Sequence, residues 1–542
     1  MADISDEADR LVKSLFDARS LLDQLRGTDP RRQSLARLAT LGELLVVPRL
    51  LHLFAADDPL SEEAARTIAT LVEKIGPTEL ARIDQQARSY SCTYGGSSDD
   101  WWTLSPVAVS RLQRVSAAYP AALGVASSHP NGYVREAVVK ALGTHTAGRE
   151  IPFLALRAND WVWPVAARAG ELLARRLVPD NQPAVLTALP FLVRMLSQRR
   201  QDHTRFTDAL RAVLVSDGGR HVLSRLHEFD RRVRRFVYEL VGSNTPAADS
   251  MLRPALADAD AAIRRSAIRR LAALWDIETS TPILENMLMR DHSPAVRKEA
   301  LTLLAERRPE RVRQLLPHVL LDRSARVREL ARFCVRDLEA PIVPRNFYIA
   351  GLANTSTLPL STAIAGLGET GSSTDVELLA SCLNAVAPRV RRAALIASAR
   401  LDPGRGIPMA LTALADAAPS VRTAAVHVLA GHSRHVNFAI VRNHLHGLGD
   451  PATRRKLLHV VKEAPKWDAV VLLLEVLGDP DDGVRRKAAE LLGDWVTGFN
   501  RQQAPPGPTH LARIRSLLEA HESRIDEATA SLLRFSLRAA DS

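Results

Sequence analysis

The segment LGDPDDGVRRKAAELLGDW, residues 477–495, contains the pattern that decides the fold. An acidic turn with a proline and glycine comes directly before a Val-Arg pair and an alanine-rich helical pattern. Asp479 is suited to cap this helix, because a carboxylate accepts hydrogen bonds from the free backbone N–H groups of a first helical turn. Val484, Ala488 and Leu491 follow at i, i+4 and i+7, so they form one apolar stripe. We therefore expect a turn followed by a helix that packs on one side.

The Val-Arg pattern recurs nine more times between residues 129 and 464. Aligned on the position of Val484, successive copies are 31, 68, 30, 33, 31, 63, 31, 32 and 31 residues apart. Each of the two long gaps is expected to contain a degenerate copy, near residues 199 and 358. A period in the low thirties with two helical patterns per unit is typical of a stacked helical solenoid. The reference position is held by Val134, Val165, Val233, Ile263, Val296, Val327, Val390, Val421, Thr453 and Val484.

The repeated unit resembles HEAT repeats, in particular the bacterial type related to phycobilisome-lyase HEAT-like repeats, over 129–495 and more weakly over 30–83. Stretches such as AGLGETG (365–371) and RLDPGRGIPMALTALAD (400–416) also resemble long bacterial HEAT-repeat proteins. Period and resemblance together imply an all-α fold, an α-solenoid of stacked HEAT-type helix pairs that forms a curved superhelical rod. The resemblance implies no particular activity, because such repeats serve many unrelated functions.

Composition and breaks in the pattern suggest four regions. We expect an N-terminal helical cap with degenerate repeats over 1–83 and an irregular insertion over 84–106. The repeat array is expected over 107–499, and a linker with a C-terminal helical cap over 500–542. Hydrophobic residues make up 46% of the chain but aromatic residues only 5%, so Leu, Ala, Val and Ile are expected to build the core.

The sequence also indicates a compartment. The acidic start MADISDEADR lacks the basic and apolar regions of a signal peptide. No uninterrupted apolar stretch reaches the roughly 18 residues that a membrane span requires. The cysteines Cys92, Cys334 and Cys382 are too widely separated for a disulfide framework or a zinc knuckle. We therefore expect a cytoplasmic protein with no membrane association, no metal and no cofactor.

The net charge of +11 would suit nucleic-acid binding, because a basic surface displaces counterions from phosphates. However, only 8 of the 72 basic residues are lysine, and such an excess of arginine is also expected from a GC-rich genome. Charge alone therefore does not identify the partner.

Two positions of the repeat carry opposite charges. Arginine follows the reference position in nine of the ten copies, and an acid lies five residues before it in seven. These groups are within reach of each other or of the adjacent repeat, so we interpret them as a buried or half-buried ladder that sets the repeat register. The ladder comprises Asp160, Asp258, Arg264, Asp291, Arg297, Asp322, Arg328, Asp416, Arg422, Asp479 and Arg485, with Arg135, Arg234, Arg391, Arg454 and Glu228 at the same positions of other copies.

The position after the ladder arginine is basic in six of the ten copies. It lies about 200° round the helix from the apolar reference position, so it is expected to face solvent. No acid recurs at a matching offset. If this helix lines the concave side, as HEAT resemblance implies, these residues form a basic stripe that docks an acidic partner or a phosphate backbone. The alternative is a solvated face that keeps a long rod soluble. The basic stripe is Arg235, Arg265, Lys298, Arg392, Arg455 and Arg486.

The insertion over 84–106 combines glycine, serine and acidic residues with four aromatic side chains, Tyr90, Tyr94, Trp101 and Trp102. Long irregular segments within a repeat array are often functional, and Trp and Tyr dominate interface hot spots. We therefore consider these four residues as a partner-binding anchor. The alternative is that both tryptophans pack against the next helix.

A second tryptophan pair, Trp161 and Trp163, lies beside Asp160 in NDWVWPVAARAG (159–170). HEAT-like DNA glycosylases hold a damaged nucleotide with tryptophans and an aspartate on a concave surface, and this segment is similar in residue types. Asp160 also falls on the ladder position, and Pro164 constrains the turn. Packing is therefore the preferred explanation for both tryptophans.

Two further motifs indicate no chemistry. Gly366, Gly368 and Gly371 satisfy G-x-G-x-x-G, but a dinucleotide site needs this motif between a strand and a helix. Here it ends a helical pattern. A histidine group lacks the cysteine or supporting acid of a metal site, so surface or packing roles are expected. These histidines are His427, His432, His435, His444 and His446.

The leading hypothesis is a non-enzymatic interaction scaffold that binds a partner protein, with an acidic surface, on the concave face of the solenoid. The alternative is a nucleic-acid-binding protein that uses the basic stripe. A more remote alternative is a HEAT enzyme that resembles a DNA glycosylase or a bilin lyase. No catalytic, cofactor-binding or metal-binding residue is assigned.

Overall fold

The computed structural model describes residues 4–17, 29–89, 100–198, 204–241, 248–498 and 506–541. Within these ranges the regular elements are α-helices and short 3-10 helices, and none is a strand. The all-α prediction is therefore confirmed. None of the helices in these ranges has the length and apolar character needed to cross a membrane.

The chain divides into two compact units, unit 1 over residues 1–275 and unit 2 over residues 276–542. The division falls between α17 (Ala261–Leu274) and α18 (Ile277–Arg290). None of the regions expected from the sequence ended there, because the repeat pattern continues across it without a change in period.

Unit 1 consists of short helices with one buried apolar core. Its first helices do not follow the repeat, whereas α8 and α9, then α10 and α11, form regular pairs. The helices are α1 (Asp6–Ser14), α3 (Arg31–Leu41), α4 (Val47–Ala55), α5 (Ser61–Val72), α6 (Pro77–Gln86), α7 (Val109–Val115), α8 (Pro120–Ala126), α9 (Gly132–Leu142), α10 (Ile151–Arg157), α11 (Trp163–Ala174), α12 (Gln182–Leu196), α13 (Thr204–Val215), α14 (Arg220–Arg225), α15 (Arg231–Val241), α16 (Ala248–Ala257) and α17.

Unit 2 is a more regular stack. Its helices are α18, α19 (Pro294–Arg307), α20 (Pro309–Val319), α21 (Ala325–Asp337), α22 (Pro344–Gly351), α23 (Thr357–Thr370), α24 (Pro388–Leu401), α25 (Pro403–Ala413), α26 (Pro419–Gly431), α27 (Phe438–Gly447), α28 (Pro451–Val461), α29 (Lys466–Val476), α30 (Asp482–Thr497), α31 (Pro508–His521) and α32 (Glu527–Asp541).

The turn residues fix where the repeat helices begin. Proline occupies the first turn of α19, α24, α26 and α28, where its missing N–H removes no helical hydrogen bond. Aspartate caps α17, α28 and α30, where the caps are Asp260, Asp450 and Asp481. Asp479 is therefore not the cap of α30, as the sequence suggested; Asp481, two residues later, accepts the N–H of Val484.

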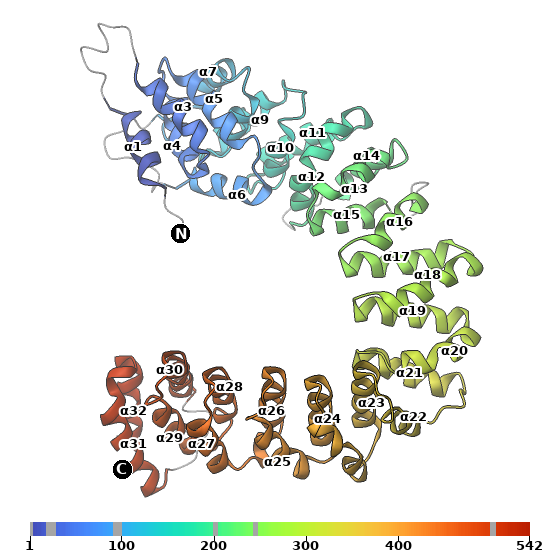
Figure 1. The fold of residues 1–542 in the computed structure, drawn as a ribbon. Helices are drawn as coiled ribbons and strands as arrows, with labels where there is room; N and C mark the ends of the chain where they lie inside the picture. Colours follow the sequence, from blue (N-terminus) through green and yellow to red (C-terminus); the bar gives the residue numbers. More distant parts are fainter. Residues whose placement is uncertain are drawn as a thin grey trace. The chain divides into compact units, whose positions relative to one another are not determined.

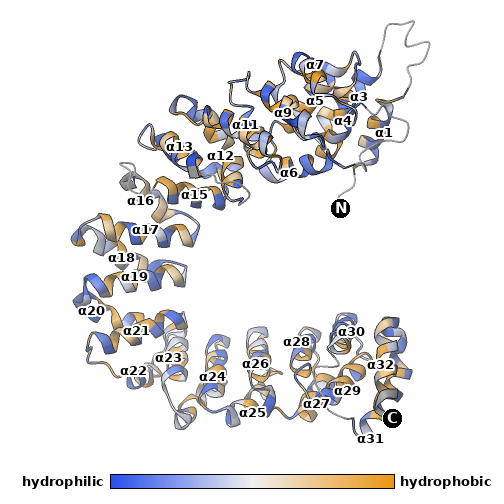
Figure 2. Ribbon diagram, turned by 180° about the vertical axis from the view of Figure 1, so that it is seen from behind, coloured by the Kyte–Doolittle hydropathy of each residue, from blue (hydrophilic) through white to orange (hydrophobic). Residues whose placement is uncertain are grey.

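Stacking follows the apolar stripe. Each reference residue of the ten copies is buried, with at most 4% of its surface exposed. In unit 2, α24, α26, α28 and α30 each contact the next, while α25 packs beside α24 and α26. Figure 2 shows apolar and polar residues alternating along these helices, as expected for helices that bury one face. The prediction of stacked helix pairs is therefore confirmed within each unit.

The two degenerate copies differ in how much of them is described. The pair α22 and α23 occupies the second long gap, with its turn just before residue 358. The pair α12 and α13 occupies the first, but residues 199–203 of its turn lie outside the described ranges.

The helices of unit 2 form two rows. Figure 1 shows α19, α21, α24, α26, α28 and α30 on the inner side of the curve that this unit follows, and α20, α22, α25 and α27 on the outer side. We call the first set the inner row. Each of its helices begins with a reference residue and a ladder arginine, so the row presents equivalent positions to solvent. At the C-terminal end, α31 contacts α29 and α32 contacts α30.

Candidate functional site

The ladder connects neighbouring repeats. Nε of Arg297 donates to Oδ2 of Asp322, and Nη2 donates to Oδ1, both over 2.7 Å. This parallel pair of hydrogen bonds is the strong geometry of an arginine–carboxylate contact. The same two-bond contact joins Arg135 to Asp160, Arg234 to Asp258, Arg391 to Asp416, and Arg454 to Asp479.

Each ladder arginine also binds its own turn. Nη1 of Arg297 donates to the carbonyl oxygen of Asp291 over 2.8 Å, and Nη1 of Arg264 donates in the same way to Asp258. The acid is fixed as well, because Oδ1 of Asp291 accepts the N–H of Ser293 over 2.7 Å. The arginine therefore joins the backbone of one turn to the carboxylate of the next, which sets the spacing between repeats.

Three copies depart from this arrangement. Arg422 donates from Nη2 to Asp450 over 3.0 Å and from Nε to Thr453. Arg328 pairs with Glu369 near the end of α23, because the degenerate turn before α23 lacks the acid. Arg485 contacts Asp482 of its own helix, and its Nη1 donates to the carbonyl oxygen of Asp479.

Asp416 and Asp160 are two ladder carboxylates with lowered pKa values. Hydrogen bonds from Arg391 keep the pKa of Asp416 below its ordinary value. Burial opposes ionisation of Asp160, but the hydrogen bonds from Arg135 and the charge of Arg157 still lower its pKa. These arginines are thus neutralised inside the protein, so they contribute little positive charge to its surface.

Unit 1 surrounds one ladder pair with a buried cluster. Besides Arg135, Asp160 accepts from Nη1 of Arg157 over 2.9 Å, and Arg157 also pairs with Asp84. Arg88 lies 3.1 Å from Asp84. We call these five residues the Asp160 cluster. Because its carboxylate is buried and paired, Asp160 is not placed to act on a bound nucleotide, which removes the basis of the glycosylase comparison.

The tryptophans of the expected insertion lie against the core. Trp101 is 1% exposed, and its Nε1 donates to the carbonyl oxygen of Ala87 over 2.9 Å. Its ring packs edge-on against His129, with ring centres 4.7 Å apart. Trp102 is half-buried and lies edge-on to His52. The partner-anchor expectation is therefore corrected for Trp101, which has almost no surface to offer. Tyr90 and Tyr94 lie outside the described residues.

The other tryptophan pair contradicts the prediction that its two rings are packed. Trp161 and Trp163 are each 71% exposed, so packing does not explain them. Sequence reasoning could not distinguish the two pairs, because each stands beside an aspartate in a turn.

The six residues of the basic stripe are all exposed. Arg235 pairs with Asp260 over 2.7 Å, and Arg486 pairs with Asp482 over 2.9 Å. An acid therefore forms an ion pair with this position in two of the repeats, although no acid recurs at a fixed offset in the sequence. Within the described ranges, the remaining four have no ion-pair partner. These four are Arg265, Lys298, Arg392 and Arg455.

Three consecutive helices of the inner row carry no acid. The sequences of α24, α26 and α28 contain arginine, lysine and histidine but neither Asp nor Glu. Their ladder arginines are paired with Asp416, Asp450 and Asp479. The other basic side chains of these helices are exposed, and we call them the basic face: Arg389, Arg392, Arg400, Arg455 and Lys456.

The basic face lies on α24 and α28, with α26 between them. Arg389, Arg392 and Arg400 fall at i, i+3 and i+11 of α24 and therefore lie on one side of that helix. Nζ of Lys456 in α28 donates to Oγ1 of Thr423 in α26 over 2.8 Å, which joins the helices across this side. Two of the five residues, Arg392 and Arg455, were predicted from the sequence as part of the basic stripe. The other three could have been found from the three successive helices that contain no acid.

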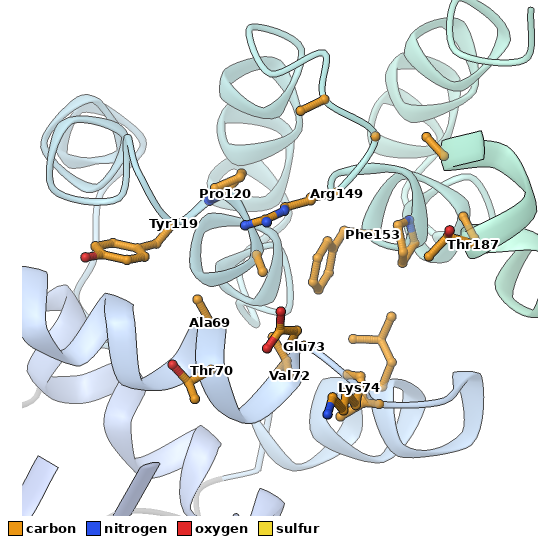
Figure 3. Close-up of a pocket in the computed structure, with 18 of the residues that line it drawn as sticks. Ala69, Thr70, Val72, Glu73, Lys74, Tyr119, Pro120, Arg149, Phe153 and Thr187 are labelled. Atoms are coloured by element: carbon orange, nitrogen blue, oxygen red, sulfur yellow. The ribbon is translucent and has the colours of Figure 1, made fainter. Parts of the chain in front are cut away.

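Unit 1 contains a ligand-sized pocket of about 680 Å³. Helix α6 contacts both α4 and α12. Figure 3 shows Arg149, Glu73 and Phe153 directed into the pocket, with Tyr119 and Lys74 at its sides. Nε of Arg66, also in the lining, donates to the Tyr119 hydroxyl over 2.8 Å.

Two glycines shape this pocket. A Cβ on Gly124 would lie 2.2 Å from the ring of Phe153, so only glycine lets that ring lie against α8. Gly148 has a φ of +87°, and a Cβ there would lie 2.3 Å from Ala184. The polar side chains of the lining are Arg66, Thr70, Glu73, Lys74, Tyr119, Arg149 and Thr187. Aromatic and cationic walls suit binding of an anionic apolar group.

The glycine motif and the histidine group have structural explanations. A Cβ on Gly366 would lie 2.2 Å from the ring of Tyr348, and one on Gly368 would lie 2.7 Å from Ala397. These glycines therefore allow α23 to pack closely on its neighbours. Among the described residues, no three His, Cys, Asp or Glu side chains are grouped as metal ligands.

Residues 250–335 match a family model described as HEAT repeats. A comparison with curated proteins finds no match. Solved structures with a similar fold include Kap95p with RanGDP (12% identity, 99% of this chain and 67% of that chain, TM-score 0.34). Others are importin beta in a polyethylene glycol condition (13%, 96% and 88%, TM-score 0.35) and a Kap95–Nup1 complex (13%, 99% and 67%, TM-score 0.37).

At TM-scores below 0.5 these likenesses carry no argument about function. The family match covers α16–α21, where the ladder pair of Arg297 and Asp322 lies. Residues 250–335 of this chain are therefore identified as HEAT repeats.

Proposed function

We propose that the chain is a non-enzymatic scaffold that binds an acidic partner protein on the inner row of unit 2. The observation that carries the proposal is the basic face, a group of exposed cations on α24 and α28, which together with α26 between them contain no acid. Such a surface attracts an acidic partner and rejects basic ones, which gives fast association and specificity.

The ladder supports this assignment by elimination. Arg391, Arg422 and Arg454 belong to the same three helices, but each is paired with a carboxylate of the next turn. Their guanidinium groups are fixed in the stack and are not free to reorganise around a ligand. The cations of the basic face do not join neighbouring turns through carboxylates in this way, so docking leaves the stack unchanged.

Features between the cations favour a protein partner over a phosphate backbone. Ile396 lies between Arg392 and Arg400 on α24 and is 42% exposed. A Cβ on Gly431, at the end of α26, would meet no atom within 4 Å, so this end of the helix is open. Protein interfaces combine apolar contacts with a charged rim, whereas nucleic-acid backbones are held mainly by cations.

The proposal assigns no reaction to the chain. The pocket of unit 1 offers aromatic and cationic walls for binding. A binding role accounts for both the pocket and the basic face.

The proposal is tested by capture of a partner from an extract of the source organism on the immobilised chain. Three forms are compared: the unaltered chain, a face variant (Arg392→Glu, Arg400→Glu, Arg455→Glu) and a control variant (Arg82→Glu, Arg114→Glu, Arg290→Glu). The control changes the same charge at exposed arginines outside the basic face. Each capture is repeated after nuclease treatment.

We expect the unaltered chain and the control variant to retain one acidic protein that the face variant does not retain. Nuclease treatment should leave this protein bound. Equal retention by the face variant would overturn the assignment of the site. Loss of all retained protein after nuclease treatment would favour the nucleic-acid alternative.

A further inference from the structure

Four exposed apolar side chains lie on successive turns of unit 1. Val107 is 84% exposed and Tyr133 is 76% exposed. The other two are the exposed tryptophans Trp161 and Trp163. The first lies in a 3-10 turn (Pro106–Ala108) before α7, the second at the start of α9, and the tryptophans at the start of α11. We call these four residues the aromatic ridge.

The three turns are neighbours. The 3-10 turn at Val107 contacts α9, and α9 contacts α11. A Cβ on Gly132 would lie 3.3 Å from Val162, which stands between the two tryptophans. Figure 1 shows α7, α9 and α11 following one another in unit 1. The ridge therefore spans adjacent turns, and exposed apolar surface of this kind marks interaction sites.

The turns are held rigidly by their own polar groups. Oδ1 of Asn131 accepts the N–H of Tyr133 over 2.9 Å, and Nδ1 of His129 accepts the N–H of Asn131 over 3.0 Å. Oδ1 of Asp160 accepts the N–H of Val162 over 3.0 Å. Because these turns are already ordered, a ligand that contacts them causes little further loss of backbone entropy.

The ladder also supports one ring of the ridge. The guanidinium carbon of Arg135 lies 5.8 Å from the ring centre of Trp161, within cation–π range. Arg135 is itself fully buried and bonded to Asp160. The inner side of Trp161 is therefore supported by a fixed group, while most of the ring remains open to solvent.

No exposed charge lies on these turns. Apart from the phenol of Tyr133, the ionisable residues within 105–108, 129–133 and 159–164 are His129 and Asp160, and both are buried. Burial lowers the pKa of His129, so its ring is neutral near pH 7. Although the chain has a net charge of +11, this aromatic surface carries no cation that could bind a phosphate backbone. Such an uncharged surface fits an uncharged ligand.

We propose that the aromatic ridge docks a proline-rich, uncharged segment of a partner protein in the polyproline II conformation. Stacked helix pairs place equivalent turns about 8–10 Å apart. A polyproline II helix repeats every three residues and advances about 9 Å in that distance, so residues i, i+3 and i+6 would meet three successive turns. Aromatic side chains are the usual partners of proline rings in such recognition. This site is separate from the basic face and does not depend on it.

The probe is a synthetic decaproline peptide, and its comparison is a Gly-Ser peptide of the same length. Binding is measured by calorimetry and by the change in tryptophan fluorescence of the unaltered chain. The ridge variant is Trp161→Ala with Trp163→Ala. The matched control is Phe333→Ala, which removes an exposed aromatic ring from α21 in unit 2. A melting curve of each variant establishes that it is folded.

We expect decaproline to bind the unaltered chain and the Phe333→Ala variant, and to bind the ridge variant at least about tenfold more weakly. Affinity should not change between about 0.1 and 1 M salt, because no charge takes part. If the ridge variant melts early, the milder variant Tyr133→Ala, at a residue that is 76% exposed, replaces it. The proposal is overturned if decaproline does not bind, if it binds the ridge variant equally well, or if an oligothymidylate binds the ridge more tightly than decaproline.

Discussion

The first turn of α9 in unit 1 and the first turn of α24 in unit 2 use the same charged contact but present different surfaces. Arg135 and Arg391 both donate two hydrogen bonds to the aspartate of the next turn. Beside the first pair lie exposed tryptophans without charge, and beside the second lie exposed arginines without acids. The shared contact is therefore structural, and the two units differ in the positions that the ladder does not use.

The largest expected effect is on the Asp160 cluster. Asp160→Ala would leave Arg135 and Arg157 buried without their shared carboxylate, and both are at most 1% exposed. Loss of one partner of a buried ion pair typically costs about 3–5 kcal/mol of unfolding free energy. Denaturant unfolding of unit 1 should report this loss. An unchanged midpoint would mean that water reaches these guanidinium groups and that the cluster is not buried in solution.

A smaller effect is expected where the ladder is nearer to solvent. Arg297→Ala removes the partner of Asp322, whose side chain is 12% exposed, so water partly replaces the lost contact. The expected cost is about 1–3 kcal/mol. The sequence left open whether Arg297 pairs with the acid of its own turn, Asp291, or with that of the adjacent repeat, and the structure shows the contact with Asp322. A double-mutant cycle with Asp322→Ala should therefore show coupling, and a cycle with the Arg297–Asp291 pair should show much less.

Acid should weaken the ladder. The pKa of Asp416 is lowered in the folded chain by hydrogen bonds from Arg391. A carboxyl with a lowered folded pKa contributes stability above its unfolded pKa of about 4, and this contribution is lost as pH falls through the folded value. Urea midpoints measured from about pH 6 to pH 3 should therefore fall, and the Arg391→Gln variant should show a flatter fall. Identical pH profiles would show that Arg391 does not hold the carboxylate ionised.

The regular part of this fold could be predicted from the sequence. Val484 and its equivalents recur at a constant period, and a constant period requires equivalent packing, so their burial followed from the pattern. The partner of each ladder arginine could not be predicted, because that choice depends on the distance between stacked turns. Asp322 lies 25 residues from Arg297, and Asp291 lies only six residues away.

The sites were harder to predict than the repeats. Trp101 is buried by contacts with His129 and Ala87, which lie far from it in sequence, whereas Trp161 lies against Arg135 and still leaves 71% of its surface exposed. The pocket of unit 1 arises where α6 contacts α12, outside the repeat period. Features that depend on such irregular contacts leave no periodic signal in the sequence.

The smallest effect on stability is expected at the basic face. Arg392 and Arg455 are exposed and have no ion-pair partner among the described residues, so their replacement by glutamate should leave the melting temperature unchanged. This result would contrast with the ladder variants in the same helices. Early melting of the face variant would mean that these side chains stabilise the stack and would remove the distinction between ladder and face.

The most direct test of the central claim is the affinity of the captured partner, purified, for the face variant and for the Arg82, Arg114 and Arg290 control variant. Charge reversal at three interface positions should weaken binding by about a hundredfold or more, with most of the loss at low salt. The control variant should bind as the unaltered chain does. Equal affinity of the face variant and the unaltered chain would contradict the claim that the basic face on α24 and α28 is the docking site.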